Sequence, residues 1–259
     1  MPVRITKAIQ RLLLAVGLML AGTGGAAADN VDMMDQVFHL DIPASQLAEV
    51  NAAFPEDGSL DSAYLDTAND PNLYLYSRAE VTFTFLGEGA GYKNSVGYFL
   101  YDDNYNILNS HTIFSNASGA GSGLAGGGSL LPGDSVVLGV FDAGTHIGFW
   151  LRANGYNNPN GPIYYTLEGM NPDKKRHYAL WADHANQRMV FGVEDLPNLG
   201  DRDYNDLLFS VTADPYSALT TGASTPEPAT LLLLASGLAG LAGFSWRRRR
   251  PWERAAPTN

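Results

Sequence analysis

Hydrophobic and polar residues alternate along most of the chain between residues 73 and 213. The pattern is clearest at 79–86, where Val81, Phe83 and Phe85 alternate with threonines. A period of two is typical of a half-buried β-strand. Other short strand-like segments cover 96–101, 107–114, 163–167, 178–181, 188–193 and 207–211, and two more, 136–141 and 147–151, are continuously apolar. About ten short strands with turns between them, and no alternating helical segments, predict an all-β antiparallel sandwich of the jelly-roll type.

The segment before these strands, residues 29–72, is less regular and is interpreted as an N-terminal extension of the domain. A short strand is expected at 37–41, followed by a helix at 46–54 with Ser45 as its cap and Pro55 at its end. Residues 56–72 are polar and acidic, which favours a loop. After the strands, residues 214–225 are rich in Thr, Ser and Gly and are interpreted as a linker.

The N-terminal 28 residues have the features of a secretory signal peptide. Arg4, Lys7 and Arg11 precede an apolar stretch at 12–21, and small residues at 26–28 offer a cleavage site. The apolar stretch is too short to span a bilayer.

A second targeting feature lies at the C-terminus. Pro226, Glu227 and Pro228 precede an uncharged apolar segment at 229–246 that is long enough for a transmembrane helix. The cluster Arg247, Arg248, Arg249 and Arg250 follows it, and residues 251–259 form a tail. Arginines next to a span stay on the cytoplasmic side, which leaves residues 29–225 outside.

This ending, over residues 226–250, resembles the PEP-CTERM sorting signal of exported proteins in Gram-negative bacteria. The resemblance implies recognition by an exosortase-type protease, cleavage near the Pro-Glu-Pro motif, and release or transfer to the cell surface. It also implies an association with exopolysaccharide. The 251–259 tail is longer than the few residues usual in that family.

Charge and composition narrow the choice of partner. Residues 29–225 hold 8 Lys and Arg against 25 Asp and Glu, a formal charge of −17. Such a surface repels phosphate backbones, so no nucleic-acid partner is expected. The chain has no Cys, which excludes disulfides and thiolate metal sites.

The most concentrated chemistry lies between residues 192 and 209. Six oxygen-bearing side chains, with no His among them, occupy thirteen positions: Glu194, Asp195, Asp201, Asp203, Asn205 and Asp206. Neighbouring carboxylates repel unless a cation or protons lie between them. Oxygen donors favour Ca²⁺, which takes about 6–8 of them, so a calcium site is expected here, although the EF-hand spacing is absent. The alternative is that these side chains only cap turns.

Four other motifs are weighed against plain structural roles. Asp102 and Asp103 are a second candidate ion site, but a strand-connecting turn is favoured. Residues 133–135 (Gly-Asp-Ser) resemble a lipase nucleophile block without its frame and are interpreted as a turn. His177 and His184, with Asp183, are a possible zinc set, but histidines scattered on a sheet are commoner. The glycine-rich segment 119–128 is interpreted as a loop.

The exposed aromatics offer a possible sugar surface. Tyr156, Tyr164 and Tyr165, near several asparagines, are candidates for stacking on sugars, or else belong to the core and its loops.

The middle of the chain, residues 73–212, resembles family 4114 of the domains of unknown function. The resemblance is carried by residues 89–98, 130–135 and 148–151, and above all by 192–196 with 200–206. It has implications for the fold rather than for an activity.

Three functions are compared. The first is an exported, non-catalytic, calcium-binding protein of the cell surface or exopolysaccharide matrix. The second is a calcium-dependent carbohydrate-binding module. The third is a glycoside hydrolase, which requires two carboxyl groups at about 5–5.5 Å or 6.5–9.5 Å across a cleft.

Overall fold

The structure is a computed structural model that describes residues 33–56, 60–120 and 127–222. The predicted signal peptide, the Pro226–Glu227–Pro228 motif, the apolar segment 229–246 and the arginine cluster lie outside the described residues. Within the described ranges, no helix is long and apolar enough to cross a membrane.

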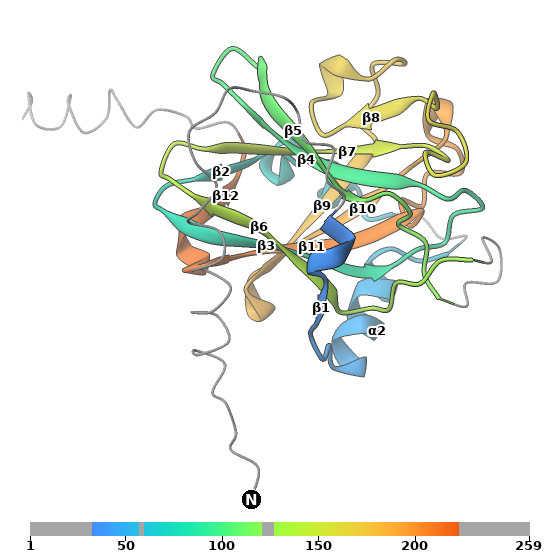
Figure 1. Ribbon diagram of the computed structural model, residues 1–259, viewed down its shortest axis with the longest axis horizontal. Coiled ribbons are helices and arrows are strands. Elements are labelled where there is room, and N and C mark those ends of the chain that lie inside the picture. Colours follow the sequence, from blue (N-terminus) through green and yellow to red (C-terminus); the bar gives the residue numbers. More distant parts are fainter. Residues whose placement is uncertain (1–32, 57–59, 121–126, 223–259) are drawn as a thin grey trace, which may run out of the picture.

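Two antiparallel sheets lie against each other as layers (Figure 1). The first sheet has the order β1 (Phe38–His39), β6 (Asp134–Phe141), β3 (Ala79–Gly87), β11 (Leu207–Asp214), β10 (Arg188–Val193), β9 (Tyr178–Asp183). The second has the order β12 (Leu219–Thr221), β2 (Leu73–Leu75), β7 (His146–Arg152), β4 (Ser95–Tyr101), β5 (Ile107–Phe114), and β8 (Ile163–Tyr165) also pairs with β7. The all-β sandwich expected from the alternating pattern is therefore confirmed.

Aromatic residues fill the space between the sheets. Phe209 of β11 stacks on Phe83 of β3 and on Phe191 of β10, with ring centroids 4.5 Å and 4.7 Å apart. Phe149 of β7, in the facing sheet, contacts Phe209 at 5.2 Å. Alternate residues of each strand point into this core, which explains the period of two in the sequence.

The first sheet is also covered on its outer face. Helix α2 (Ala44–Ala53) buries Val50, and Phe54, directly after the helix, is also buried. Both pack against Leu86, Ala179, Val190 and Leu208, which point outward from β3, β9, β10 and β11. Because these strands are buried on both faces, β10 and β11 read as continuous apolar runs rather than as alternating ones.

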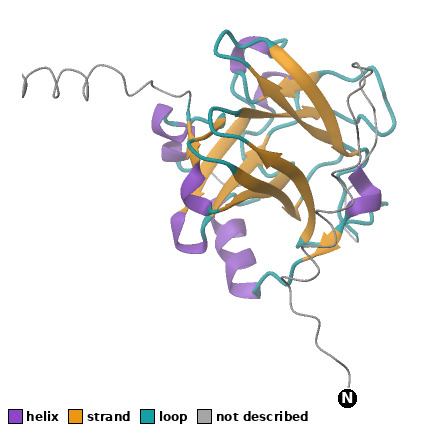
Figure 2. Cartoon of the chain, turned by 60° about the vertical axis from the view of Figure 1, so that its left-hand side comes forward, coloured by secondary structure: helices purple, strands orange, loops and turns teal. Residues whose placement is uncertain are grey.

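The remaining helical segments are short and lie around the strands (Figure 2). They are η1 (Met33–Gln36), η2 (Ser62–Leu65), η3 (Thr67–Asn69), η4 (Glu168–Met170), η5 (His184–Asn186), η6 (Pro197–Leu199) and η7 (Tyr216–Ala218). The expected cap at Ser45 was wrong. Helix α2 begins at Ala44 after Pro43, and no side chain caps it.

The expected linker at 214–225 is partly folded, which corrects that interpretation. Residues 216–218 form η7, and β12 pairs with β2 so that Leu219 lies opposite Leu75. The N-terminal region is likewise more ordered than expected, because η2 and η3 occupy part of the predicted loop 56–72.

Candidate metal centre

The predicted ligands lie on the connection between β10 and β11, at the ends of two interior strands of the first sheet. These strands pair so that Val193 faces Leu207. Glu194 therefore leaves one strand at the level where Asp206 enters the other, and residues 195–205 form the loop between them. This register brings the two ends of the acidic sequence together.

The backbone of the loop is tightly curled. Four residues other than glycine have positive φ values: Asn198 (63°), Leu199 (72°), Arg202 (68°) and Tyr204 (56°). Such values are uncommon outside glycine and cost roughly 1–3 kcal/mol each, so surrounding contacts must hold them. Because Arg202 and Tyr204 alternate with Asp201 and Asp203, the two aspartates turn to the same side.

Three of the six predicted residues meet at one point. Glu194, Asp201 and Asp203 each offer a carboxylate oxygen within 4.8 Å of the others. The Glu194 side chain is 0% exposed, and neither of its carboxylate oxygens has a hydrogen-bond partner among the described residues. A buried carboxylate without a partner is costly, so this geometry requires a proton or a cation at the cluster.

Gly200 makes this approach possible. It has a φ of 37°, and a Cβ atom there would lie only 2.7 Å from Oε1 of Glu194. A side chain at this position would collide with the carboxylate that points into the cluster.

Asp195 and Asp206 form a second layer beside the first. The backbone N–H of Asp195 donates to Oδ2 of Asp206 at 2.8 Å. Nδ2 of Asn94, from the segment before β4, donates to Oδ2 of Asp195 at 2.6 Å. These contacts brace the loop.

Asn205 is anchored through its amide nitrogen and its backbone carbonyl. Its Nδ2 donates to Oε2 of Glu56 at 2.9 Å, and its backbone carbonyl accepts from the N–H of Gly89 at 2.9 Å. A Cβ atom at Gly89 would lie 2.6 Å from Oδ1 of Asn205, so glycine is needed there as well. Glu56 and Asn94 were missed by the sequence analysis, because each lies about a hundred or more positions from its partner.

The electrostatics of the cluster follow from its burial. Burial, together with the charges of Asp206, Asp201 and Asp203, raises the pKa of Glu194 from 4.5 to about 9. Burial and Asp206 raise the pKa of Asp195 to about 7. Burial is also the main cause that raises the pKa of Asp206. Without a cation, Glu194 is therefore protonated at neutral pH.

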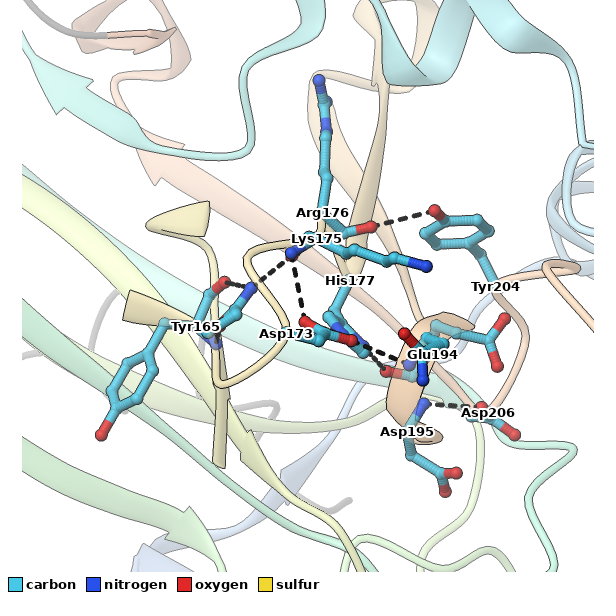
Figure 3. Close-up of polar contacts among 11 residues, drawn as sticks. Tyr165, Asp173, Lys175, Arg176, His177, Glu194, Asp195, Tyr204 and Asp206 are labelled. Atoms are coloured by element: carbon cyan, nitrogen blue, oxygen red, sulfur yellow. Dashed lines mark hydrogen bonds and ion pairs between the residues drawn. The ribbon is translucent and has the colours of Figure 1, made fainter. Parts of the chain in front are cut away.

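His177 connects this cluster to the loop before β9 (Figure 3). Nδ1 of the ring lies 2.7 Å from the Glu194 carbonyl oxygen, and Nε2 lies 3.0 Å from the Asp173 carboxylate. Both partners are oxygen atoms, so the ring bridges the end of β10 and the Asp173 loop. The ring of Tyr164 stacks on it, with centroids 3.7 Å apart.

Asp173 completes this connection. Burial by itself would raise the pKa of the Asp173 carboxyl group. Hydrogen bonds from the backbone N–H of Asn198 and from His177 outweigh this effect, so the pKa is lowered. The N–H of Asn198 donates to Asp173 at 2.8 Å, so the same carboxylate also holds the start of the acidic loop.

The zinc hypothesis for the histidines was wrong. His177 uses both ring nitrogens as described, and His184 bonds through Nδ1 to the hydroxyl of Tyr216. The third member of that set, Asp183, pairs with Arg188 at 2.8 Å. The three side chains are engaged in separate contacts.

The other motifs have structural roles. Asp102 accepts hydrogen bonds from Asn104 and Asn106 within its own turn, chiefly the side-chain bond from Asn106, which lowers its pKa. Asp103 pairs with His146 instead of facing Asp102.

The structure also shows where residues 133–135 and the three candidate tyrosines lie. Ser135 is buried and donates to the carbonyl of Gly133, so the residues 133–135 form a turn, as expected. Of the three tyrosines considered for sugar stacking, Tyr164 is buried and Tyr165 is partly buried, whereas Tyr156 is exposed.

Comparison with protein families confirms both resemblances. Residues 141–214 match the family described as "Domain of unknown function (DUF4114)", and residues 224–250 match the PEP-CTERM protein-sorting motif. The first match begins later than the expected 73, but it contains the acidic loop. Comparison with curated proteins gave no match, nor did comparison with solved structures. The PEP-CTERM motif indicates an exported protein that is sorted by an exosortase.

Proposed function

We propose that this chain is a calcium-binding, non-catalytic β-sandwich protein that acts at the cell surface or in the exopolysaccharide matrix. The observation that carries the proposal is the buried Glu194 carboxylate, which has no hydrogen-bond partner among the described residues and lies beside Asp201 and Asp203. A proton shared with Asp206 would engage only one of the two Glu194 oxygens. A divalent cation would use both oxygens.

The donor set and its spacing favour calcium. All three side chains supply oxygen, which suits a hard cation. Two oxygens bound to one Ca²⁺ at about 2.4 Å can be at most about 4.8 Å apart, which matches the separation limit met by this cluster. Asp206, beside Glu194, is a candidate for a further ligand, and water and backbone carbonyls would complete the coordination.

Calcium would act by holding the loop closed. It would join the end of β10 to residues 201 and 203 and remove the repulsion that burial imposes on Glu194. Because calcium would bind the folded chain and not the unfolded one, saturation at about 100 times the dissociation constant would stabilise the fold by roughly 2.7 kcal/mol. Export places such a site where calcium is plentiful relative to the cytoplasm, and the sorting motif supports export.

A non-catalytic role is supported by the state of the candidate reactive groups. The hydroxyl of Ser135 is engaged with Gly133 and lies within 2.9 Å of the Thr84 hydroxyl, so it is not presented as a nucleophile. The carboxylates of Glu194 and Asp203 are buried in a strand connection, which fits ion binding better than the open cleft that a glycoside hydrolase needs.

Thermal unfolding of the full chain in detergent tests the proposal. We expect Ca²⁺ to raise the melting temperature relative to EDTA, and Asp203→Ala to abolish that increase. Asp142→Ala is the matched control, because the Asp142 side chain is 81% exposed and its ion pair among the described residues is with Arg78 at the surface. Equal melting temperatures in Ca²⁺ and EDTA for the unmodified chain would overturn the proposal.

A further inference from the structure

A second feature, separate from the acidic cluster, is a surface pocket of about 490 Å³. Its walls come from the segment before β2, the turn between β4 and β5, and the η4 region. The residues that determine its chemistry are Asp70, Asn72, Tyr105, Glu168, Met170 and Arg176. The volume lies within the range of about 300–1,000 Å³ usual for small-ligand sites.

Asn72 gives the pocket a buried acceptor that lacks a partner. The residue is 9% exposed, and its Oδ1 has no hydrogen-bond partner among the described residues. Nδ2 of Asn72 donates to Oδ1 of Asp70 at 2.7 Å, and the backbone N–H donates to the same oxygen at 2.9 Å. Since a carboxylate only accepts, these bonds fix the amide with Oδ1 turned away from Asp70, and because that oxygen is buried the amide braces the Asp70 carboxylate rather than reaching a ligand.

The single cation of the pocket is not free to bind a ligand. The guanidinium of Arg176 donates to the backbone carbonyls of residues 64, 65, 66, 69 and 178. These bonds use its donors to hold the η2–η3 segment against β9. The charged groups left to face a ligand are therefore acceptors, the carboxylates of Asp70 and Glu168.

An aromatic ring forms the exposed wall. Tyr105 is 56% exposed and has a left-handed backbone, with φ of 63°, in the β4–β5 turn. Its ring stacks on that of the buried Tyr101, with centroids 6.0 Å apart and planes 16° apart. This packing fixes one face of Tyr105 and leaves the rest of the ring available for contact.

The geometry points to a binding site for a neutral sugar unit in this pocket. A pyranose ring offers several hydroxyl donors for the carboxylates of Asp70 and Glu168, and an apolar C–H face for Tyr105 and Met170. An anionic sugar or a phosphate would be repelled by Asp70 and Glu168. No residue of the acidic cluster lines the pocket, so the inference goes beyond the calcium proposal and does not depend on it.

The test is binding of the full chain, in detergent and with calcium present throughout, to an array of immobilised neutral hexose oligosaccharides. Polyuronates on the same array serve as anionic probes. Calcium is kept constant so that the two proposals fail independently. We expect the unmodified chain to bind at least one neutral oligosaccharide, and Tyr105→Ala to weaken that binding by about tenfold or more.

The matched control is Tyr76→Ala, because Tyr76 is 56% exposed, the same fraction as Tyr105, but does not line the pocket. We expect its binding to equal that of the unmodified chain. Glu168→Gln, at an exposed position, should also weaken binding while leaving the melting temperature unchanged. Binding to polyuronates alone, no binding to any neutral sugar, unchanged binding by Tyr105→Ala, or loss in Tyr76→Ala would each overturn the inference.

Discussion

Replacing Glu194 by glutamine keeps the shape of the side chain and removes its charge. The buried carboxylate has a pKa of about 9 in the folded chain against its ordinary 4.5, and burial is the main cause. Glutamine is neutral at every pH, so it does not need to take up a proton in order to be buried. The calcium-free variant should therefore be more stable than the unmodified chain at neutral pH.

The size of this gain follows from the pKa difference. At about pH 7.5 the solution is about three pH units above the ordinary pKa of 4.5, and keeping the carboxyl group protonated costs about 1.4 kcal/mol for each unit. The variant avoids this cost, so its gain in the free energy of unfolding is at most about 4 kcal/mol. Near pH 4.5 the two chains should be almost equally stable, because the carboxyl group is then protonated with little cost.

Calcium should reverse the advantage. The amide can supply one neutral oxygen where the carboxylate supplied two charged ones, so the affinity should fall and the calcium-dependent gain should disappear. For a domain of this size, the gain of roughly 2.7 kcal/mol at 100-fold saturation corresponds to about 5–10 °C in melting temperature.

The assay is thermal unfolding of both chains in EDTA and in Ca²⁺, at about pH 4.5 and about pH 7.5. The reasoning predicts a more stable variant in EDTA at the higher pH only, and a calcium-dependent increase in the unmodified chain only. A variant that is less stable in EDTA at about pH 7.5, or that keeps the full calcium-dependent increase, would refute it.

Three further predictions concern pH, the loop glycine and the core. First, because the folded-state pKa values of Glu194 and Asp195 are raised to about 9 and about 7, their contribution to stability is fully present below about pH 4 and is lost as pH rises through those values. Melting temperatures in EDTA should fall over this window and flatten in Ca²⁺; a flat profile in EDTA would contradict the pKa shifts. Second, Gly200→Ala should cost about 1–3 kcal/mol in chemical denaturation and weaken calcium binding, because its Cβ would lie 2.7 Å from Glu194; retention of wild-type stability and affinity would show that the loop has a different conformation. Third, Phe209→Ala should cost about 3–5 kcal/mol in the same assay without removing calcium binding from the folded fraction, because it leaves a cavity between the sheets; a loss below about 1 kcal/mol would indicate that the ring is not in the core.

The strands were predictable where one face is buried. In β3 the alternation of Phe83 and its neighbours with threonines reports the core directly, and β5 and β10 have the predicted bounds. The three-residue strand β12 was not predictable. Leu219, Thr220 and Thr221 are too few to show a period, and their partner β2 lies far away in sequence.

The candidate site was predictable only in part, for a similar reason. Glu194, Asp201 and Asp203 are close in sequence, and their meeting follows from the hairpin-like pairing of β10 with β11. Asn205 stays a predicted ligand, but the contact of its amide nitrogen with Glu56, 149 positions earlier, was not predictable. No local pattern can indicate such a contact, which depends on the complete fold.

The brace formed by His177 and Asp173 was also outside what the sequence could indicate. His177 was considered a zinc ligand because of its spacing from His184, but its ring lies between the Glu194 carbonyl and Asp173. Its role depends on the pairing of β9 with β10, which places Tyr178 opposite Val193 and so brings His177 beside Glu194.

The central claim is that a divalent cation resolves the burial of Glu194. The most direct measurement is the number of calcium ions retained per chain after equilibrium dialysis against radioactive Ca²⁺, for the unmodified protein and for Glu194→Gln. The account predicts one tightly held ion in the unmodified chain and none in the variant at the same free calcium concentration. No retained calcium in the unmodified chain, or equal retention in both, would contradict it.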